Sequence, residues 1–183
     1  PEELRAAADA VAKLPNRLPD PSRKKGDEEK PATIELLSSV HISFDDTGMS
    51  TTTRHDIWRI ERDDTTLRTG TMYWDPWREH RPAVDLRVVS PDGRERKLDP
   101  ATLVEQSVAT GLGEMYVDTR KLIAPLPGAR RGAIVEQLDT VVQEKPFLTN
   151  GQSGIVPVGT GRLGRVEVVL DAPVGLPLRY DSK

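Results

Sequence analysis

Apolar and polar side chains alternate over long stretches of this chain, and a period of two predicts β-strands with one buried face. One such stretch covers residues 34–44, and a second over residues 51–62 carries Trp58 and Ile60 on its inward face. Asp45-Asp46-Thr47-Gly48 lies between them and suits a hairpin turn, because glycine readily adopts a positive φ. In the first stretch one face carries Ile34, Leu36, Val40, Ile42 and Phe44, and the other carries Glu35, Ser39, His41 and Ser43.

Further short strands are expected along the rest of the chain, each bounded by turn residues. Val84, Leu86 and Val88 alternate with polar residues before a Pro91-Asp92-Gly93 turn. Other candidate strands lie at residues 117–124, 134–142 (with Ile134, Leu138 and Val142), 154–158 and 166–171. Residues 100–106 carry conflicting signals for helix and strand. The pattern predicts an all-β fold, an antiparallel β-sandwich of about eight or more strands.

The first 31 residues differ from the rest in composition. Leu4, Ala7, Val11 and Leu14 recur at helical spacing, which predicts a short helix over residues 1–14, either packed on a neighbour or ending an upstream domain. Residues 15–31 are charged and rich in proline, which is typical of a linker. The sandwich domain is therefore expected over residues 32–180.

Composition and charge exclude several function classes. The 26 Lys and Arg residues against 29 Asp and Glu give a net charge of −3, with both signs mixed, so no nucleic-acid-binding face is expected. No apolar run is long enough for a membrane helix, so no membrane insertion is expected within this chain. The chain has no cysteine, which excludes disulfides, thiolate metal sites and a thiol nucleophile within it.

Candidate catalytic and metal-binding residues have simpler interpretations. His41 and His55 lie at mirrored places on the first hairpin, but neither they nor His80 match a known ligand spacing. The aspartate pairs at residues 45–46 and 63–64 suit turns as well as they suit a calcium ion. Carboxylate pairs for acid–base chemistry depend on strand register, which the sequence does not give. No catalytic residue, metal site or cofactor is therefore predicted.

Tyr73, Trp74 and Trp77 are the candidate ligand or partner surface. Flat aromatic rings can stack on sugars or anchor a protein partner. The competing interpretation places Trp74 or Trp77 in the core, because a chain with 4% aromatic residues needs its large rings to fill the interior.

Three segments in order resemble a known bacterial family. They are Tyr73–Pro100, with "SPDGR…LDP", then residues 126–136, "LPGARRGAIVE", and Arg165–Tyr180, with "APVGLPLRY". Together they resemble the transglutaminase-associated N-terminal β-sandwich domain of unknown function that precedes bacterial transglutaminase-like (cysteine peptidase-like) domains. The resemblance covers roughly residues 32–180.

The resemblance implies a non-catalytic accessory domain, extracytoplasmic (periplasmic or secreted), that positions an enzyme or binds a protein or peptide. The expected partners include a downstream transglutaminase-like domain of the same polypeptide. Such an enzyme uses a Cys-His-Asp set, and this chain has no cysteine. Two alternatives stay open: a carbohydrate-binding module that uses the three aromatic residues, and a stand-alone hydrolase that uses carboxylates.

Overall fold

The computed structural model describes residues 32–63, 65–108, 118–146 and 163–177. These residues form nine β-strands and two short 3₁₀ helices, which confirms the predicted all-β sandwich. The elements are β1 (Thr33–Phe44), β2 (Ser50–Ile60), η1 (Thr65–Arg68), β3 (Thr69–Trp74), β4 (Ala83–Val89), β5 (Glu95–Lys97), η2 (Pro100–Thr102), β6 (Val104–Ser107), β7 (Arg120–Pro125), β8 (Ile134–Val142) and β9 (Leu163–Asp171).

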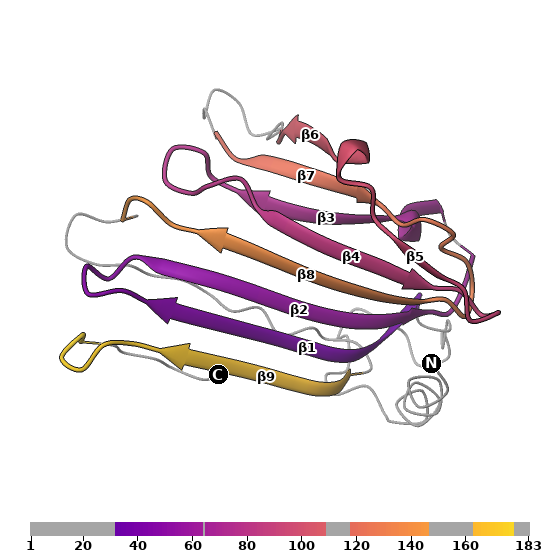
Figure 1. Ribbon diagram of the computed structural model, residues 1–183, viewed down its shortest axis with the longest axis horizontal. Coiled ribbons are helices and arrows are strands. Elements are labelled where there is room, and N and C mark those ends of the chain that lie inside the picture. The colour runs from indigo at the N-terminus through magenta and orange to yellow at the C-terminus, as the bar shows by residue number, and fades with distance from the viewer. Residues whose placement is uncertain (1–31, 64, 109–117, 147–162, 178–183) are drawn as a thin grey trace, which may run out of the picture.

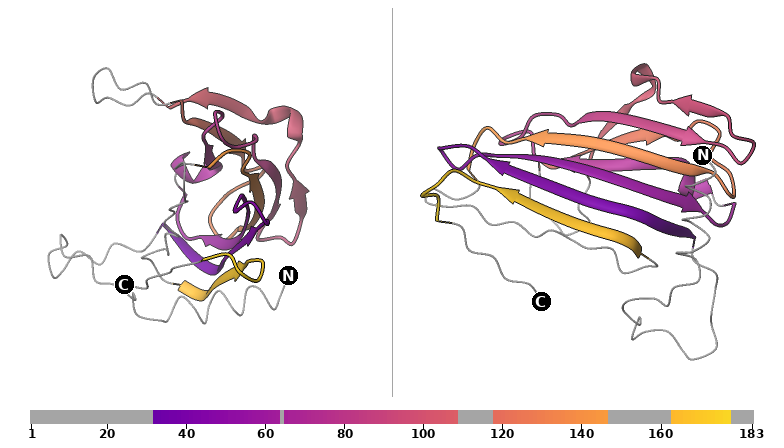
Figure 2. Two further views of the ribbon diagram at one scale, coloured as in Figure 1. Left: turned by 90° about the vertical axis from the view of Figure 1, so that its left-hand side faces the viewer. Right: turned by 60° about the horizontal axis from the view of Figure 1, so that its bottom comes forward.

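The strands form two sheets that curve around a common interior (Figures 1 and 2). The larger sheet has six strands in the order β5-β4-β8-β2-β1-β9, and the smaller has three in the order β3-β7-β6. Most neighbouring strands are antiparallel, as predicted, but β9 runs parallel to β1. β1 and β9 are the first and the last of the described strands, so seven other strands lie between them in the sequence. The predicted helix over residues 1–14, the linker and the strand over residues 154–158 lie outside the described residues.

The main hydrophobic core lies between the two sheets. The larger sheet contributes Ile60, Leu86, Val88, Ala133 and Val135, and the smaller sheet and the loop after it contribute Met72, Trp74, Leu122, Ala124 and Leu126. We call the face of the larger sheet that carries this core its inner face. A second, smaller cluster of Ile34, Leu36 and Ile134 lies on the opposite, outer face. Packing at the two faces thus sets the register of the central strands.

The simple alternation predicted for residues 34–44 is wrong, because β1 contains a β-bulge. The pairing with β2 shifts between Glu35 and Leu37, so one residue of β1 has no partner. Glu35 therefore lies opposite Trp58 on the inner face, and Ile34 packs in the outer cluster. Val40 beyond the bulge returns to the inner side, opposite Arg54. The five apolar residues of this stretch do not share one face.

Two other segments add detail to the secondary structure predicted from the sequence. β3 (Thr69–Trp74) is a separate strand that pairs with β7, whereas the sequence suggested only the hairpin that follows it. Residues 100–106 contain both elements that their conflicting signals suggested, the 3₁₀ helix η2, capped by the Asp99 side chain, and then β6. Among the described residues, no helix is long and apolar enough to cross a membrane.

Candidate functional site

The aromatic residues singled out in the sequence do not form a common surface. Tyr73 and Trp77 are 56% and 44% exposed, whereas Trp74 is only 4% exposed. Adjacent side chains of a strand point to opposite faces, so Tyr73 faces outward from β3 and Trp74 enters the inter-sheet core. Trp74 is thus a core residue, and only Tyr73 and Trp77 of the three can contact a ligand.

Trp77 lies on a well-connected turn after β3. The Asp75 amide donates to Oε2 of Glu79 at 2.8 Å, and the Thr119 hydroxyl donates to Oδ1 of Asp75 at 2.6 Å. Nε of Arg78 donates to the other oxygen of Asp75 at 3.2 Å, and its guanidinium lies 5.9 Å from the centre of the Trp77 ring. These hydrogen bonds hold the turn that carries Trp77.

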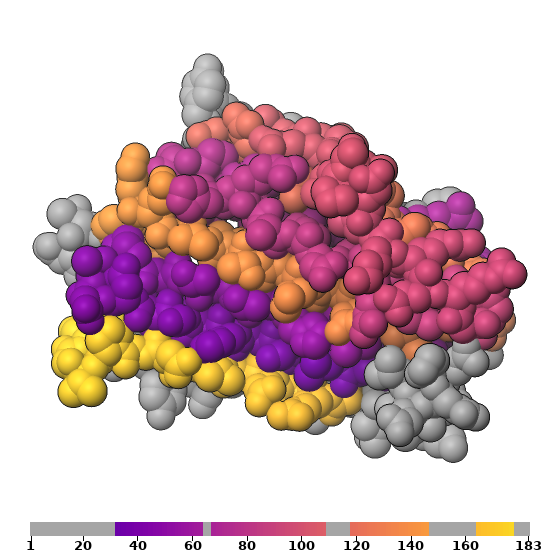
Figure 3. Space-filling view, viewed as in Figure 1, coloured from indigo at the N-terminus to yellow at the C-terminus, as the bar shows by residue number. Residues whose placement is uncertain are grey.

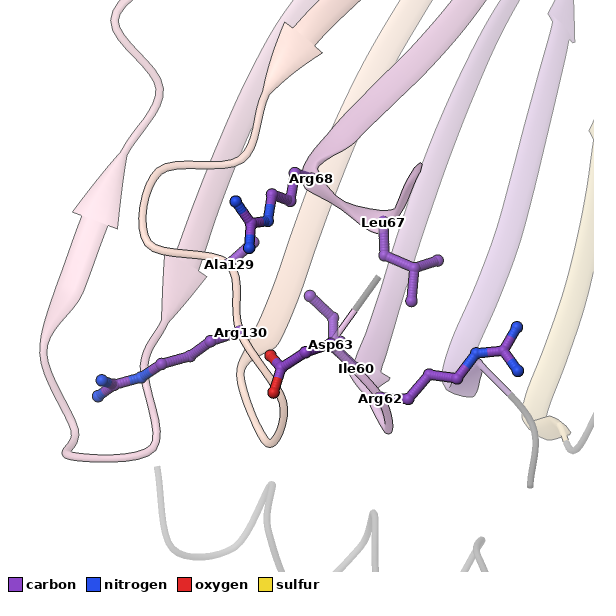
Figure 4. Close-up of a pocket in the computed structure, with 7 residues that line it drawn as sticks. All are labelled: Ile60, Arg62, Asp63, Leu67, Arg68, Ala129 and Arg130. Atoms are coloured by element: carbon purple, nitrogen blue, oxygen red, sulfur yellow. The ribbon is translucent and has the colours of Figure 1, made fainter. Parts of the chain in front are cut away.

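A hollow at one end of the sandwich carries three arginines, and Figure 4 shows how they lie. Arg62 and Arg130 extend in opposite directions, and the Arg68 side chain bends toward Ala129 (Figure 4). Arg130 pairs with Asp92 at 3.3 Å. The guanidinium groups do not converge on one point, so the hollow does not resemble a built anion site. Its lining residues are Ile60, Arg62, Asp63, Leu67, Arg68, Ala129 and Arg130.

The three histidines each lie beside a different carboxylate. Nε2 of His41 is 2.6 Å from Asp171, Nε2 of His55 is 2.8 Å from Glu136, and Nε2 of His80 is 2.9 Å from Glu144. Within the described part of the chain, no three His, Cys, Asp or Glu side chains are placed to hold a metal ion. The histidines therefore act as surface pairing residues in this structure.

Three carboxyl side chains gather on the inner face of the six-stranded sheet: Glu35 on β1, Asp56 on β2 and Asp139 on β8. We call them the carboxyl cluster. Glu35 lies opposite Trp58, two residues from Asp56 on the same face of β2. Asp139 lies opposite Arg54, which also shares that face. The register therefore places Asp56 diagonally between the other two carboxyls, whose partners on β2, Trp58 and Arg54, are four residues apart.

The cluster is only partly satisfied by hydrogen bonds. Oγ of Ser38 donates to Oδ1 of Asp56 at 2.9 Å, and Nε2 of Gln137 donates to Oδ1 of Asp139 at 2.9 Å. Asp139 is 2% exposed, yet its Oδ2 has no hydrogen-bond partner in the described structure, and the same holds for Oε2 of Glu35. Buried polar atoms are normally paired, so these two oxygens distinguish the cluster from an ordinary core.

Burial raises the pKa of each carboxyl group in the cluster. The negative charge of Asp56 raises the pKa values of Glu35 and Asp139 further. For Asp56 and Asp139, hydrogen bonds from Ser38 and Gln137 and the charge of Arg54 oppose this effect without cancelling it. All three groups therefore favour the protonated form more than an exposed carboxyl does.

Sequence reasoning missed this cluster, although part of the signal was present. Asp56 has the same parity as Trp58 and Ile60, which were placed inward, so Asp56 could have been assigned to the interior. In β8 the sequence pointed to Ile134, Leu138 and Val142, but Leu138 and Val142 are 41% and 39% exposed. The residues of β8 that enter the interior are Val135, Gln137 and Asp139.

The edge strand β9 is the second unusual feature. Among the described strands it pairs only with β1 and so forms one end of the larger sheet (Figure 2). Figure 3 shows it along the lower margin of the molecule. Val168, Val169 and Leu170 are 45%, 36% and 42% exposed. Long apolar edge strands are sites at which another chain can add a strand.

The fold and these features define an all-β sandwich domain. The chain belongs to the DUF3857 family, a domain of unknown function with a solved structure, whose family model matches residues 46–183. No curated protein matches the sequence.

One solved structure resembling this chain is that of a candidate protease from Parabacteroides distasonis ATCC 8503. The two share 10% sequence identity with a TM-score of 0.57, over 64% of this chain. The matched region spans 24% of that longer protein. The likeness supports the fold, and at this identity it carries no residue roles.

Proposed function

We propose that this chain is a non-catalytic accessory domain that binds an extended segment of a protein partner along β9. The observation that carries this proposal is the edge position of β9 among the described strands, with three consecutive apolar residues exposed. A peptide in extended conformation can pair with such an edge through its backbone, and its alternate side chains then contact those of the edge strand.

The register of β9 defines the chemistry of the partner. Val168 and Leu170 lie beside Val40 and Ile42 of β1, so these side chains share the inner side of the sheet. Val169 lies beside His41 on the outer side, next to Asp171. A partner strand would therefore place apolar side chains at every second position toward the inner side and polar ones outward.

The proposal includes the setting of the domain. The order of its motifs resembles the module that precedes transglutaminase-like enzymes in exported proteins, and a related fold forms about a quarter of a longer chain from Parabacteroides distasonis. We therefore propose an extracytoplasmic location, with a transglutaminase-like domain of the same polypeptide among the partners. The absence of such a domain from the complete encoding gene would contradict this part alone.

Strand addition is tested by selecting extended peptides from a displayed library on the 183-residue chain and measuring their affinity by calorimetry. Leu170→Lys should weaken binding of the selected peptides about tenfold or more, because it places a charge beside the added strand. Leu138→Lys is the matched control, because Leu138 is 41% exposed on a central strand of the same sheet.

Backbone hydrogen exchange provides the second readout. Bound peptide should slow the exchange of amides in β9, because these amides would gain partners in the added strand. Peptides that bind Leu170→Lys as tightly as the wild type, or that protect amides only away from β9, would contradict the proposal.

A further inference from the structure

The small apolar cluster on the outer face of the larger sheet is buried more deeply than its position explains. Ile34, Leu36 and Ile134 are 1%, 9% and 3% exposed. Farther along the same face of β8, Leu138 and Val142 are 41% and 39% exposed. An apolar side chain on this face thus stays well exposed where nothing lies over it, so the cluster must have a cover that Leu138 and Val142 lack.

The described residues supply only part of this cover. Ile57 and Val89 pack against the cluster and are themselves only partly buried. Arg59 lies between the two isoleucines of the cluster in one row of the sheet, and its side chain, paired with Glu61 at 2.5 Å, is 13% exposed. The three-stranded sheet packs on the inner face and does not reach the outer one. The outer face therefore requires a further apolar element over this cluster.

The chain itself carries a suitable element next to the cluster. The described structure begins at Ala32, two residues before Ile34, and the carbonyl oxygen of Ala32 accepts from the Glu61 amide at 2.9 Å. Residues 1–14 carry an apolar stripe at helical spacing. An isolated helix of this length is marginal in water, so the stripe needs a surface to pack on. The stripe consists of Leu4, Ala7, Val11 and Leu14.

The dimensions of the helix and of its tether suit this contact. From Leu4 to Leu14 a helix rises about 15 Å, at about 1.5 Å per residue. The cluster and its neighbours extend from Ile34 on β1 to Val89 on β4, which is three strand spacings or about 14 Å. A flexible tether as short as residues 15–31 gives an effective concentration of about 1 mM, so even a weak intrinsic affinity suffices for docking.

We propose that residues 1–14 form an amphipathic helix that docks on the outer apolar cluster and covers Ile34 and Ile134. The apolar stripe faces the sheet, whereas Asp9 and Lys13, on the opposite side of the helix, face water. The docked helix forms a second layer over one end of the outer face. It also joins the N-terminal segment to the domain through β1, the strand that it precedes in the sequence.

A spin label tests the position of this segment in the full chain. The chain has no cysteine, so Lys13→Cys provides one attachment site for a nitroxide, on the side of the helix that faces water. The label should broaden the methyl NMR signals of Ile57 and Val89, which lie beside the cluster. It should affect Val142 far less, because that residue lies at the far end of β8, about 26 Å from Ile134.

Amide hydrogen exchange measures the docking itself, with a matched pair of variants. In the unmodified chain, the amides of residues 5–14 should exchange slowly, because they donate within the docked helix. Val11→Lys places a charge on the apolar stripe and should speed this exchange about tenfold or more. Ala12→Lys, one position along and off the stripe, is the control and should leave both the exchange and the broadening unchanged.

Several results would overturn the proposal. Unprotected amides over residues 5–14 would do so, as would broadening that spares Ile57 and Val89. Equal effects of Val11→Lys and Ala12→Lys would show that the stripe makes no contact. Broadening of an isotope-labelled chain by a separate spin-labelled chain would assign the cover to a second copy and would also contradict the proposal.

Discussion

The two tryptophans of the Tyr73–Trp77 segment offer a direct test of the packing, because one is buried and the other is exposed. Trp74 is 4% exposed and belongs to the inter-sheet core, whereas Trp77 is 44% exposed on a turn. Replacing a buried tryptophan by alanine costs about 3–5 kcal/mol, through lost burial and the cavity that remains. Trp74→Ala should therefore remove a large part of a domain stability of about 5–15 kcal/mol.

The expected cost of Trp77→Ala is much smaller. The indole has solvent on one side, and its contact with the Arg78 guanidinium 5.9 Å away contributes about 0.5–1 kcal/mol. We expect a loss of about 1 kcal/mol from this contact and partial burial together. The same chemical change at two positions three residues apart should thus give effects that differ severalfold.

Urea unfolding followed by far-ultraviolet circular dichroism measures both variants without relying on tryptophan emission. With a slope of about 2 kcal/mol per molar urea, Trp74→Ala should lower the midpoint by about 2 M and Trp77→Ala by about 0.5 M. Trp74→Phe gives an intermediate value if the alanine variant does not fold. Equal losses for Trp74→Ala and Trp77→Ala would refute the assignment of Trp74 to the core.

Two further substitutions test the outer sheet face and a loop. Burial raises the pKa of Glu136, but hydrogen bonds from His55 and Arg87 outweigh this effect and lower it. Glu136→Gln should therefore cost about 0.5–1 kcal/mol of stability, and less in high salt. Urea unfolding at two ionic strengths measures both values. Gly132 has φ +81° with Pro91 Cγ 3.3 Å from a built Cβ, so Gly132→Ala should cost about 1–2 kcal/mol. Gly93→Ala, at φ +85° in open space, should cost less in the same assay; an equal loss would contradict the role of Pro91.

The sequence predicted the sandwich because its strands are short, alternate in polarity and end at recognisable turns. The hairpin between β1 and β2 is an example, with Gly48 at φ +81° after the aspartates. The β9 strand was also expected, but its parallel pairing with β1 was not, because polarity along a strand does not encode the direction of its neighbour.

The carboxyl cluster could not be predicted from the sequence, for a different reason. A bulge adds one residue and reverses the alternation beyond it, and nothing in the residues around Glu35 marks such an insertion. Asp139 was missed because the apolar residues of β8 lie on both faces, so hydrophobicity alone favoured the exposed Leu138. Register decides both cases, and register is a property of strand pairs.

The distribution of the core explains why β9 is a suitable strand for partner binding. In the described structure, the inter-sheet cluster draws its buried residues from around β2, β3, β4, β7 and β8, and no residue of β9 belongs to either apolar cluster. β9 is held by backbone pairing with β1 and by the exposed contact of His41 with Asp171. Few buried contacts and an exposed ladder make a strand easy to open or extend, and binding elements are often drawn from such regions. The polar inner residues Ser38, Arg54 and Asp56 lie between β9 and much of the packed core, so a strand added to β9 would extend the sheet without disturbing Trp74 and its neighbours.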